Sequence, residues 1–155
     1  MNVLLDWGNI VSHFVSLTIA YLLALPIGWD REKEARSAGL RTFPLVAIAS
    51  CGYIIIAQRV APDSPEAQAR IVEGLITGIG FIGGGAILKD GGTVRGTATA
   101  ASIWNTGAIG AAVAYGFYEI AIVLSVINFL TLRFLTPIGA SLRSQQREDV
   151  GTRHD

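Results

Sequence analysis

The strongest constraint on this chain is that its charged residues avoid most of a series of long apolar segments and gather in the linkers and the tail. Hydrophobic residues make up 51% of its 155 residues and charged residues 15%, whereas a typical soluble domain has about 25% charged residues. The hydrocarbon core of a bilayer is about 30 Å thick, so an α-helix crosses it with about 20 apolar residues. Segments of that length predict an all-α integral membrane protein rather than a soluble enzyme.

Five segments have a suitable length. They cover residues 9–28, 42–58, 71–88, 97–115 and 120–136. Trp7 and Trp29 flank the first segment, and at ~1.5 Å per residue they stand about 33 Å apart, which fits the aromatic belts at the two membrane surfaces. We therefore expect a bundle of about five transmembrane helices over residues 1–137, followed by a polar cytoplasmic tail over residues 138–155.

The distribution of Lys and Arg predicts the orientation of this bundle. If the linker over residues 30–41 is cytoplasmic, only Arg59 and Arg70 of the 12 basic residues lie outside. Cytoplasmic loops of membrane proteins carry such an excess of basic residues. The N-terminus is then outside and the C-terminus is in the cytoplasm, as an odd number of spans requires.

The third and fourth segments differ from the others because they are rich in Gly, Ala, Ser and Thr. Gly74 and Gly78, and likewise Gly80 and Gly84, follow the GxxxG spacing. Lipid provides no hydrophobic drive between helices, so small residues that let backbones approach are what packs them. We expect these two segments to form the centre of the bundle. The glycines either pack the helices tightly or form a cavity or a moving joint.

Residues 78–83 (GIGFIG) also fit the GxGxxG pattern of dinucleotide-binding folds. That pattern needs a preceding strand and a βαβ unit, whereas here it lies within an apolar segment of membrane length. Helix packing is the better interpretation, and we predict no nucleotide cofactor. The formal net charge of zero likewise indicates no basic surface for nucleic acid.

A charged cluster follows the first segment and reaches the start of the second. Its members are Asp30, Arg31, Glu32, Arg41 and Thr42, and the short linker makes the inner ends of the two segments neighbours. The cluster is either a solvated helix end held by local ion pairs or a functional cluster that offers carboxylates to a cation such as Mg²⁺. Two acids among several bases make a poor metal site, so we predict no metal centre.

Polar side chains also occur within the fourth segment, at Thr99, Ser102 and Asn105. Thr and Ser can bond back to their own helix, but the amide of Asn105 needs a partner on another helix or a wet cavity. It contributes either to an interhelical hydrogen bond or to a substrate pathway. His13 is the only histidine before the tail, and no serine is marked as a nucleophile, so we expect no enzymatic activity.

Three ordered motifs resemble the signatures of the MgtC/SapB family. The segments GWDRE (28–32) and AGLRT (38–42), with LV (45–46), resemble its first signature, GIGFIGGG (78–85) its second and GTATAASIW (96–104) its third. Three motifs in this order, within residues 11–137, make a specific match. The family positions carry over onto Asp30, Arg31, Glu32, Arg41 and Thr42, and onto the stretches that hold Gly78, Gly80, Gly83, Gly84, Trp104 and Asn105.

The resemblance implies a multi-pass protein of the bacterial inner (plasma) membrane that acts as a non-enzymatic modulator. Members of the family are linked to growth in low magnesium, and thus to magnesium homeostasis, and to survival inside macrophages, and thus to virulence. The best-known member is reported to act on the ATP synthase and so on membrane potential, which implies another membrane protein as partner. A homodimer is also compatible with the small-residue faces. The alternative function is an ion or small-solute transporter or channel.

The chain departs from the family pattern in three places. Asp30 stands where the family usually has Glu, which shortens the reach of the carboxylate, and Gly84 stands where Ala is common. The virulence-linked members also carry a soluble C-terminal domain, which we expect this chain to lack. We then expect a short member to keep only the membrane activity of the family.

Overall fold

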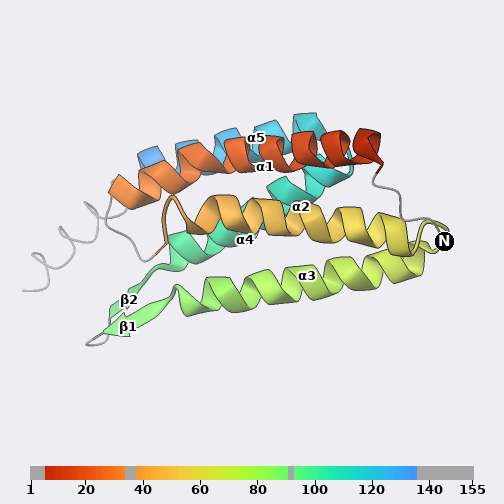
Figure 1. The fold of residues 1–155 in the computed structure, drawn as a ribbon. Coiled ribbons are helices and arrows are strands. Elements are labelled where there is room, and N and C mark those ends of the chain that lie inside the picture. The colour runs from red at the N-terminus through yellow and green to blue at the C-terminus, as the bar shows by residue number, and fades with distance from the viewer. Residues whose placement is uncertain (1–5, 34–37, 91–92, 136–155) are drawn as a thin grey trace, which may run out of the picture.

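A computed structural model describes residues 6–33, 38–90 and 93–135. In this part of the chain, five helices run alternately up and down (Figure 1): α1 (Trp7–Lys33), α2 (Thr42–Val60), α3 (Pro65–Gly85), α4 (Thr97–Ala114) and α5 (Tyr118–Leu130). A π-helical turn, η1 (Thr131–Leu135), continues α5, and the strands β1 (Leu88–Asp90) and β2 (Thr93–Arg95) form an antiparallel hairpin between α3 and α4. The all-α class is confirmed, and each apolar segment overlaps one of the helices.

Three of the described helices are long and apolar enough to cross a membrane. They are α1, α2 and the continuous helix Tyr118–Leu135 that α5 forms with η1. Neither α3 nor α4 reaches the same standard. The first turns of α3 carry Glu66, Arg70 and Glu73, and the small and polar side chains of α4 present little apolar surface to transfer out of water. Three spans therefore follow from length and composition, and the five-span bundle remains a prediction.

The helix boundaries differ from the expected ones where local signals outweigh hydropathy. α3 begins at Pro65, well before its apolar stretch, because Ser64 caps it: the Ala67 amide donates to the Ser64 hydroxyl over 3.3 Å, and proline fits the first helical position. The expected third segment ran to residue 88, but Leu88 begins β1. At the other end of the hairpin, Gly96 has a φ of 89°, and this left-handed conformation, which favours glycine, turns the chain into α4. The predicted tail lies outside the described residues.

The central helix of the bundle is α4. It contacts each of α1, α2, α3 and α5, whereas α3 contacts mainly α2 and α4 and lies at the edge of the bundle (Figure 1). Only Ile79 and Gly83 of α3 are buried. The prediction that the third and fourth segments share the centre is thus correct for α4 and wrong for α3. Only one side of α3 packs against other helices, namely α2 and α4.

Two glycines of α4 explain its position. A Cβ atom at Gly110 would collide with the carbonyl oxygen of Ala47 in α2, and one at Gly107 would collide with the side chain of Ile79 in α3. The missing side chains therefore let neighbouring helices approach α4 on two sides, as small residues do in membrane bundles.

One end of the bundle, which we call the basic end, holds most of the cationic side chains. The C-terminal end of α1, the N-terminal end of α2, the hairpin and the end of η1 all lie there (Figure 1). Its basic residues are Arg31, Lys33, Arg41, Lys89, Arg95 and Arg133, whereas Arg59 and Arg70 lie at the opposite end. Basic residues gather on the cytoplasmic side of membrane proteins. The prediction that this end lies in the cytoplasm depends on this asymmetry.

Candidate functional site

Asp30 and Arg31 form a buried ion pair at the C-terminal end of α1. Their side chains are 6% and 1% exposed, and Nη2 of Arg31 donates to Oδ2 of Asp30 over 2.6 Å. The same nitrogen lies 3.5 Å from the carbonyl oxygen of Leu132 in η1, at the limit of hydrogen-bond length. The guanidinium thus links the end of α1 to the π-helical turn, although Nε of Arg31 has no partner in the described structure.

Glu32 has a different role from its two neighbours. It is exposed, and its Oε2 accepts a hydrogen bond from the Leu40 amide over 3.1 Å. A Cβ atom at Gly39 would collide with this carboxylate, and one at Gly28 would lie only 3.2 Å from the Gly39 carbonyl oxygen. Glycines at both positions therefore let the chain before α2 pack against the end of α1, where Glu32 holds it.

Arg41 and Thr42 do not join the acidic residues. Arg41 is exposed, Thr42 is half-buried, and the Asp30–Arg31 pair is the only ion pair within the described ranges. Within the described residues, Arg41 therefore forms no ion pair with Asp30 or Glu32, and a functional role of the cluster stays a prediction. The pair at the end of α1 is instead a local, buried contact, and Arg41 lies at the mouth of a groove described below.

Four of the five glycines singled out in α3, Gly74 among them, have nothing within 4 Å of an added Cβ atom. Gly83 packs against α4, where an added Cβ would lie 3.2 Å from the carbonyl oxygen of Ala100, but nothing lies within 4 Å of a Cβ at Gly78, Gly80 or Gly84. Successive helical residues are 100° apart, so Gly78 and Gly80 lie on different sides of α3. The GxxxG pairs therefore do not pack the helices of this chain together.

The polar residues of α4 bond mainly to α5. The hydroxyl of Ser102 donates to Oδ1 of Asn128 over 2.8 Å, the Asn128 amide donates back to the Ser102 carbonyl over 3.3 Å, and the Asn105 amide donates to the Leu124 carbonyl over 3.3 Å. The interhelical hydrogen bond expected as one alternative for Asn105 is thus present. Thr99 is buried, whereas Trp104 is exposed on the bundle surface.

Sequence reasoning missed two residues of this polar seam. Asn128 is buried opposite Ser102, and the hydroxyl of Ser125 donates to the Leu23 carbonyl of α1 over 2.6 Å. The signal for Asn128 was an amide within an apolar segment, which is the same signal that identified Asn105. These hydrogen bonds connect α4 to α5 and α5 to α1. The polar side chains that could have lined a substrate pathway are therefore bonded to other helices of the bundle.

The remaining unpaired nitrogen is distant from the ion pair. Nε2 of His13 is buried without a hydrogen-bond partner in the described structure. His13 and Arg31 lie on the same helix but 18 residues apart, which is about 27 Å at 1.5 Å per residue. The two groups therefore do not form one site. Among the described residues, no three His, Cys, Asp or Glu side chains gather as metal ligands.

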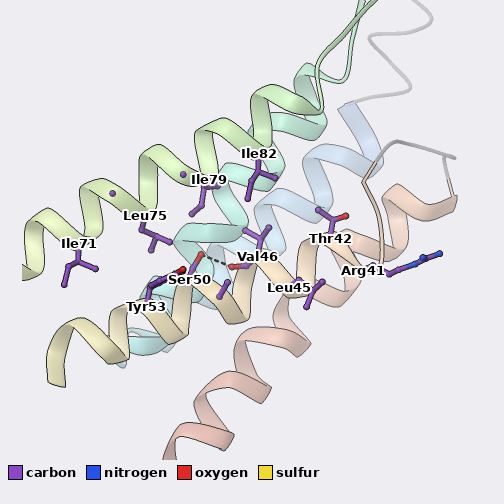
Figure 2. A pocket seen from close by; sticks show the side chains of 13 residues that line it. Arg41, Thr42, Leu45, Val46, Ser50, Tyr53, Ile71, Leu75, Ile79 and Ile82 are labelled. Atoms are coloured by element: carbon purple, nitrogen blue, oxygen red, sulfur yellow. Dashed lines mark hydrogen bonds between the residues drawn. The ribbon is translucent and has the colours of Figure 1, made fainter. Parts of the chain in front are cut away.

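An apolar groove of about 800 Å³ runs between α2 and α3. Figure 2 shows side chains from α3, including Ile71 and Ile82, directed toward Leu45 and Tyr53 of α2. Gly74 and Gly78 also line this groove, and Arg41 lies at one end of it. We call it the α2–α3 groove. The sequence analysis left a cavity at these glycines open as one alternative, but it did not place one between α2 and α3.

Comparisons with known proteins place these features in a family. The model of the MgtC family matches residues 17–141 of the chain. Protein MgtC of Salmonella typhimurium strain LT2 is 37% identical over 115 residues, which is 74% of this chain and 48% of that protein. Protein MgtC of Brucella abortus strain 2308 is 34% identical over 139 residues, which is 90% of this chain and 58% of that protein.

An uncharacterized protein from Synechocystis is 36% identical over 141 residues, which is 91% of this chain and 58% of that protein. The chain thus spans about half the length of the curated relatives it matches. No solved structure matches it significantly. The family match covers the charged end of α1, the glycine-rich helix α3 and the central helix α4. With its three membrane-length apolar helices, the chain is a membrane protein that belongs to the MgtC family.

Proposed function

We propose that this chain is a non-enzymatic modulator in the bacterial inner membrane, linked to magnesium limitation and to membrane energetics. It would cross the membrane several times, with its basic end in the cytoplasm, and act by binding another membrane protein. The ATP synthase is the partner that the family resemblance favours. The names of the relatives state no activity. The family resemblance and one feature of the structure support the proposal.

That feature is the face of α3 that carries Gly80 and Gly84. α3 lies at the bundle edge, a Cβ atom at either glycine would meet nothing within 4 Å, and Phe81 between them is 84% exposed. Small residues spaced four apart allow a foreign helix to approach closely, and such contacts drive helix association in lipid. We call this surface the outer face of α3 and propose that it binds a transmembrane helix of the partner.

Crosslinking in native membranes tests this proposal. A photoreactive amino acid at Phe81 is expected to crosslink a membrane subunit of the ATP synthase, whereas the same group at Phe14 on α1, which is also exposed, is not. Gly80→Leu is expected to lower the yield at least about tenfold, because a large side chain removes the close approach that GxxxG contacts need. Gly78→Leu, which places the same side chain on the groove side, serves as the matched control.

Crosslinks only to a second copy of the chain would contradict the modulator proposal and indicate a homodimer. An equal yield from Phe81 and Phe14 would also contradict it, because it would show no preferred face. ATP-driven proton pumping by inverted vesicles, with and without the protein, then measures whether binding changes the activity of the synthase.

The alternative function is transport of an ion or small solute. It is favoured by the buried charge of Asp30 and Arg31, because ionisable residues inside membrane proteins often mark transport pathways. The seam of Ser102, Asn105 and Asn128 weighs against it, since these side chains bond within the bundle. Liposomes with entrapped dyes for H⁺, Mg²⁺ and K⁺ decide the matter. Flux that Arg31→Gln abolishes would favour transport, whereas folded protein without flux would favour the modulator.

A further inference from the structure

The α2–α3 groove has the length of one lipid leaflet. It runs from Thr42 to Tyr53 along α2 and from Ile82 to Ile71 along α3, which is 11 residues on each helix and about 17 Å at 1.5 Å per residue. The hydrocarbon core is about 30 Å thick, so one leaflet contributes about 15 Å. If the basic end lies at the membrane surface, the groove begins there and ends near the middle of the bilayer, where an acyl chain of that leaflet also ends.

The walls of the groove are apolar and its shape is narrow. Leu45, Leu75 and Ile82 line it, and the hydroxyl of Ser50 is already bonded to the Val46 carbonyl over 2.8 Å. A helix with side chains is about 10 Å across, so a 17 Å length of it fills about 1,300 Å³, whereas the groove holds about 800 Å³. A hydrocarbon chain fits this space better than a helix from a second copy or another protein.

Charge marks one end of the groove. No acidic residue lines it, and Arg41 lies at its mouth, with its exposed side chain directed away from the other lining side chains in Figure 2. Lys89 and Arg95 of the hairpin are exposed at the same end of the bundle (Figure 1). The nearby Glu32 carboxylate is bonded to the Leu40 amide. An apolar groove that ends at a cation is complementary to a lipid with an anionic headgroup.

We propose that the α2–α3 groove binds one acyl chain of an anionic phospholipid, with the headgroup phosphate bound by Arg41. Arginine matches phosphate because its planar fork donates two parallel hydrogen bonds. Gly74 and Gly78 leave space for the chain along α3, since a Cβ at either would meet nothing within 4 Å. The site lies on the opposite flank of α3 from Gly80, so it is independent of the partner face proposed above.

Photolabelling in bilayers tests this site. The full chain would be reconstituted in nanodiscs of phosphatidylcholine and phosphatidylglycerol, with a trace of either lipid carrying a diazirine on its acyl chain, and the labelled peptides mapped by mass spectrometry. We expect label to concentrate on residues 45–53 and 71–82. The phosphatidylglycerol probe should label them about fivefold more than the phosphatidylcholine probe, the factor expected when one basic residue attracts an anionic lipid.

Two substitutions separate the headgroup from the acyl chain. Arg41→Ala should remove the preference for phosphatidylglycerol while some groove labelling remains, and Arg41→Lys should restore part of the preference. Gly78→Leu should fill the groove and lower labelling by both probes, whereas Gly84→Leu, which adds the same side chain on the outer face, should leave it unchanged. Gel filtration of each variant shows that the bundle is folded.

Label spread evenly over the lipid-facing sides of α1 and α5 would overturn the proposal, because it would show annular lipid only. Groove labelling that Gly78→Leu does not reduce would also overturn it. The partner proposal can fail independently, since its test depends on crosslinks from Phe81 and on Gly80→Leu. A protein crosslink to the groove in place of lipid would assign the groove to a helix instead.

Discussion

At the residue scale, the least expected feature is an arginine that is 1% exposed at the end of an otherwise apolar helix. Arg31 is held by its sequence neighbour Asp30 and lies near the Leu132 carbonyl. Taking two charges out of water is expensive, and their attraction offsets that cost only when the geometry is good. The pair therefore contributes little net stability, but removal of either member leaves a buried charge without its partner.

Asp30→Asn tests this description of the pair. We expect it to lower the free energy of unfolding by about 3 kcal/mol, the lower end of the range for breaking a buried ion pair, because the Arg31 guanidinium stays buried without a counter-charge. Unfolding in mixed micelles with increasing sodium dodecyl sulfate measures the change.

Glu32→Gln is the matched control for that substitution. Glu32 is exposed, and a glutamine oxygen can still accept the Leu40 amide, so we expect a loss below about 1 kcal/mol, as for exposed polar groups. Equal losses for Asp30→Asn and Glu32→Gln would contradict the assignment of a buried, coupled pair. Arg31→Gln added to Asp30→Asn should recover part of the lost stability.

At the element scale, the glycines of α3 and α4 have opposite roles despite similar sequence contexts. Gly110 lies against the backbone of Ala47, so α4 and α2 approach more closely than any larger residue at position 110 would allow. A Cβ at Gly84 in α3, by contrast, would meet nothing within 4 Å. Small residues are therefore a packing device in α4 and an exposed surface in most of α3.

The substitutions Gly110→Ala and Gly84→Ala distinguish these roles. Gly110→Ala should destabilise the bundle by about 1–3 kcal/mol, the usual cost of overpacking, because its Cβ collides with backbone that cannot move aside. Gly84→Ala should be neutral or stabilising by up to about 1 kcal/mol, since alanine has the higher helix propensity. Thermal shifts followed by fluorescence-detected gel filtration measure both, and a more harmful Gly84→Ala would contradict the exposed position of α3.

The helices were predictable from the sequence because apolar segments between charged linkers have a clear physical cause. Which helices pack against one another was not predictable. The GxxxG pairs of α3 and the small residues of α4 form similar sequence patterns, although only those of α4 pack closely against other helices. The charged residues Asp30, Arg31 and Glu32 were predictable as the end of the first apolar segment, but whether Arg41 pairs with the acids depends on how the chain before α2 packs at Gly28 and Gly39. The hairpin of Leu88–Asp90 and Thr93–Arg95 is too short to give a strand pattern.

At the scale of the whole molecule, basic residues at one end and few at the other predict which end faces the cytoplasm. α3 and α4 decide this topology, because neither is one of the three helices that are long and apolar enough to cross by themselves. If α3 crosses, then the Asp63 linker and the hairpin residue Lys89 lie on opposite sides of the membrane.

Cysteine labelling tests this topology. Cys51 is the only cysteine of the chain, so Cys51→Ser provides a background in which Asp63→Cys or Lys89→Cys is the single thiol; both positions are exposed. In intact spheroplasts, a membrane-impermeant maleimide should label Asp63→Cys, and it should label Lys89→Cys only after permeabilisation. Labelling of both from the same side would show that α3 does not cross.

The central position of α4 also determines the order in which the chain can assemble during synthesis. α4 is the fourth helix to leave the ribosome, yet each of the other four packs against it. Until residue 97 and those after it emerge, α1 and α2 have one another as neighbours, whereas α3 has only α2. α4 is itself too rich in small and polar residues to meet the hydropathy of a self-sufficient span, so we expect its insertion to depend on α1, α2 and α3, which are made before it. The bundle is then complete only when α5, the last helix to be made, packs against α4.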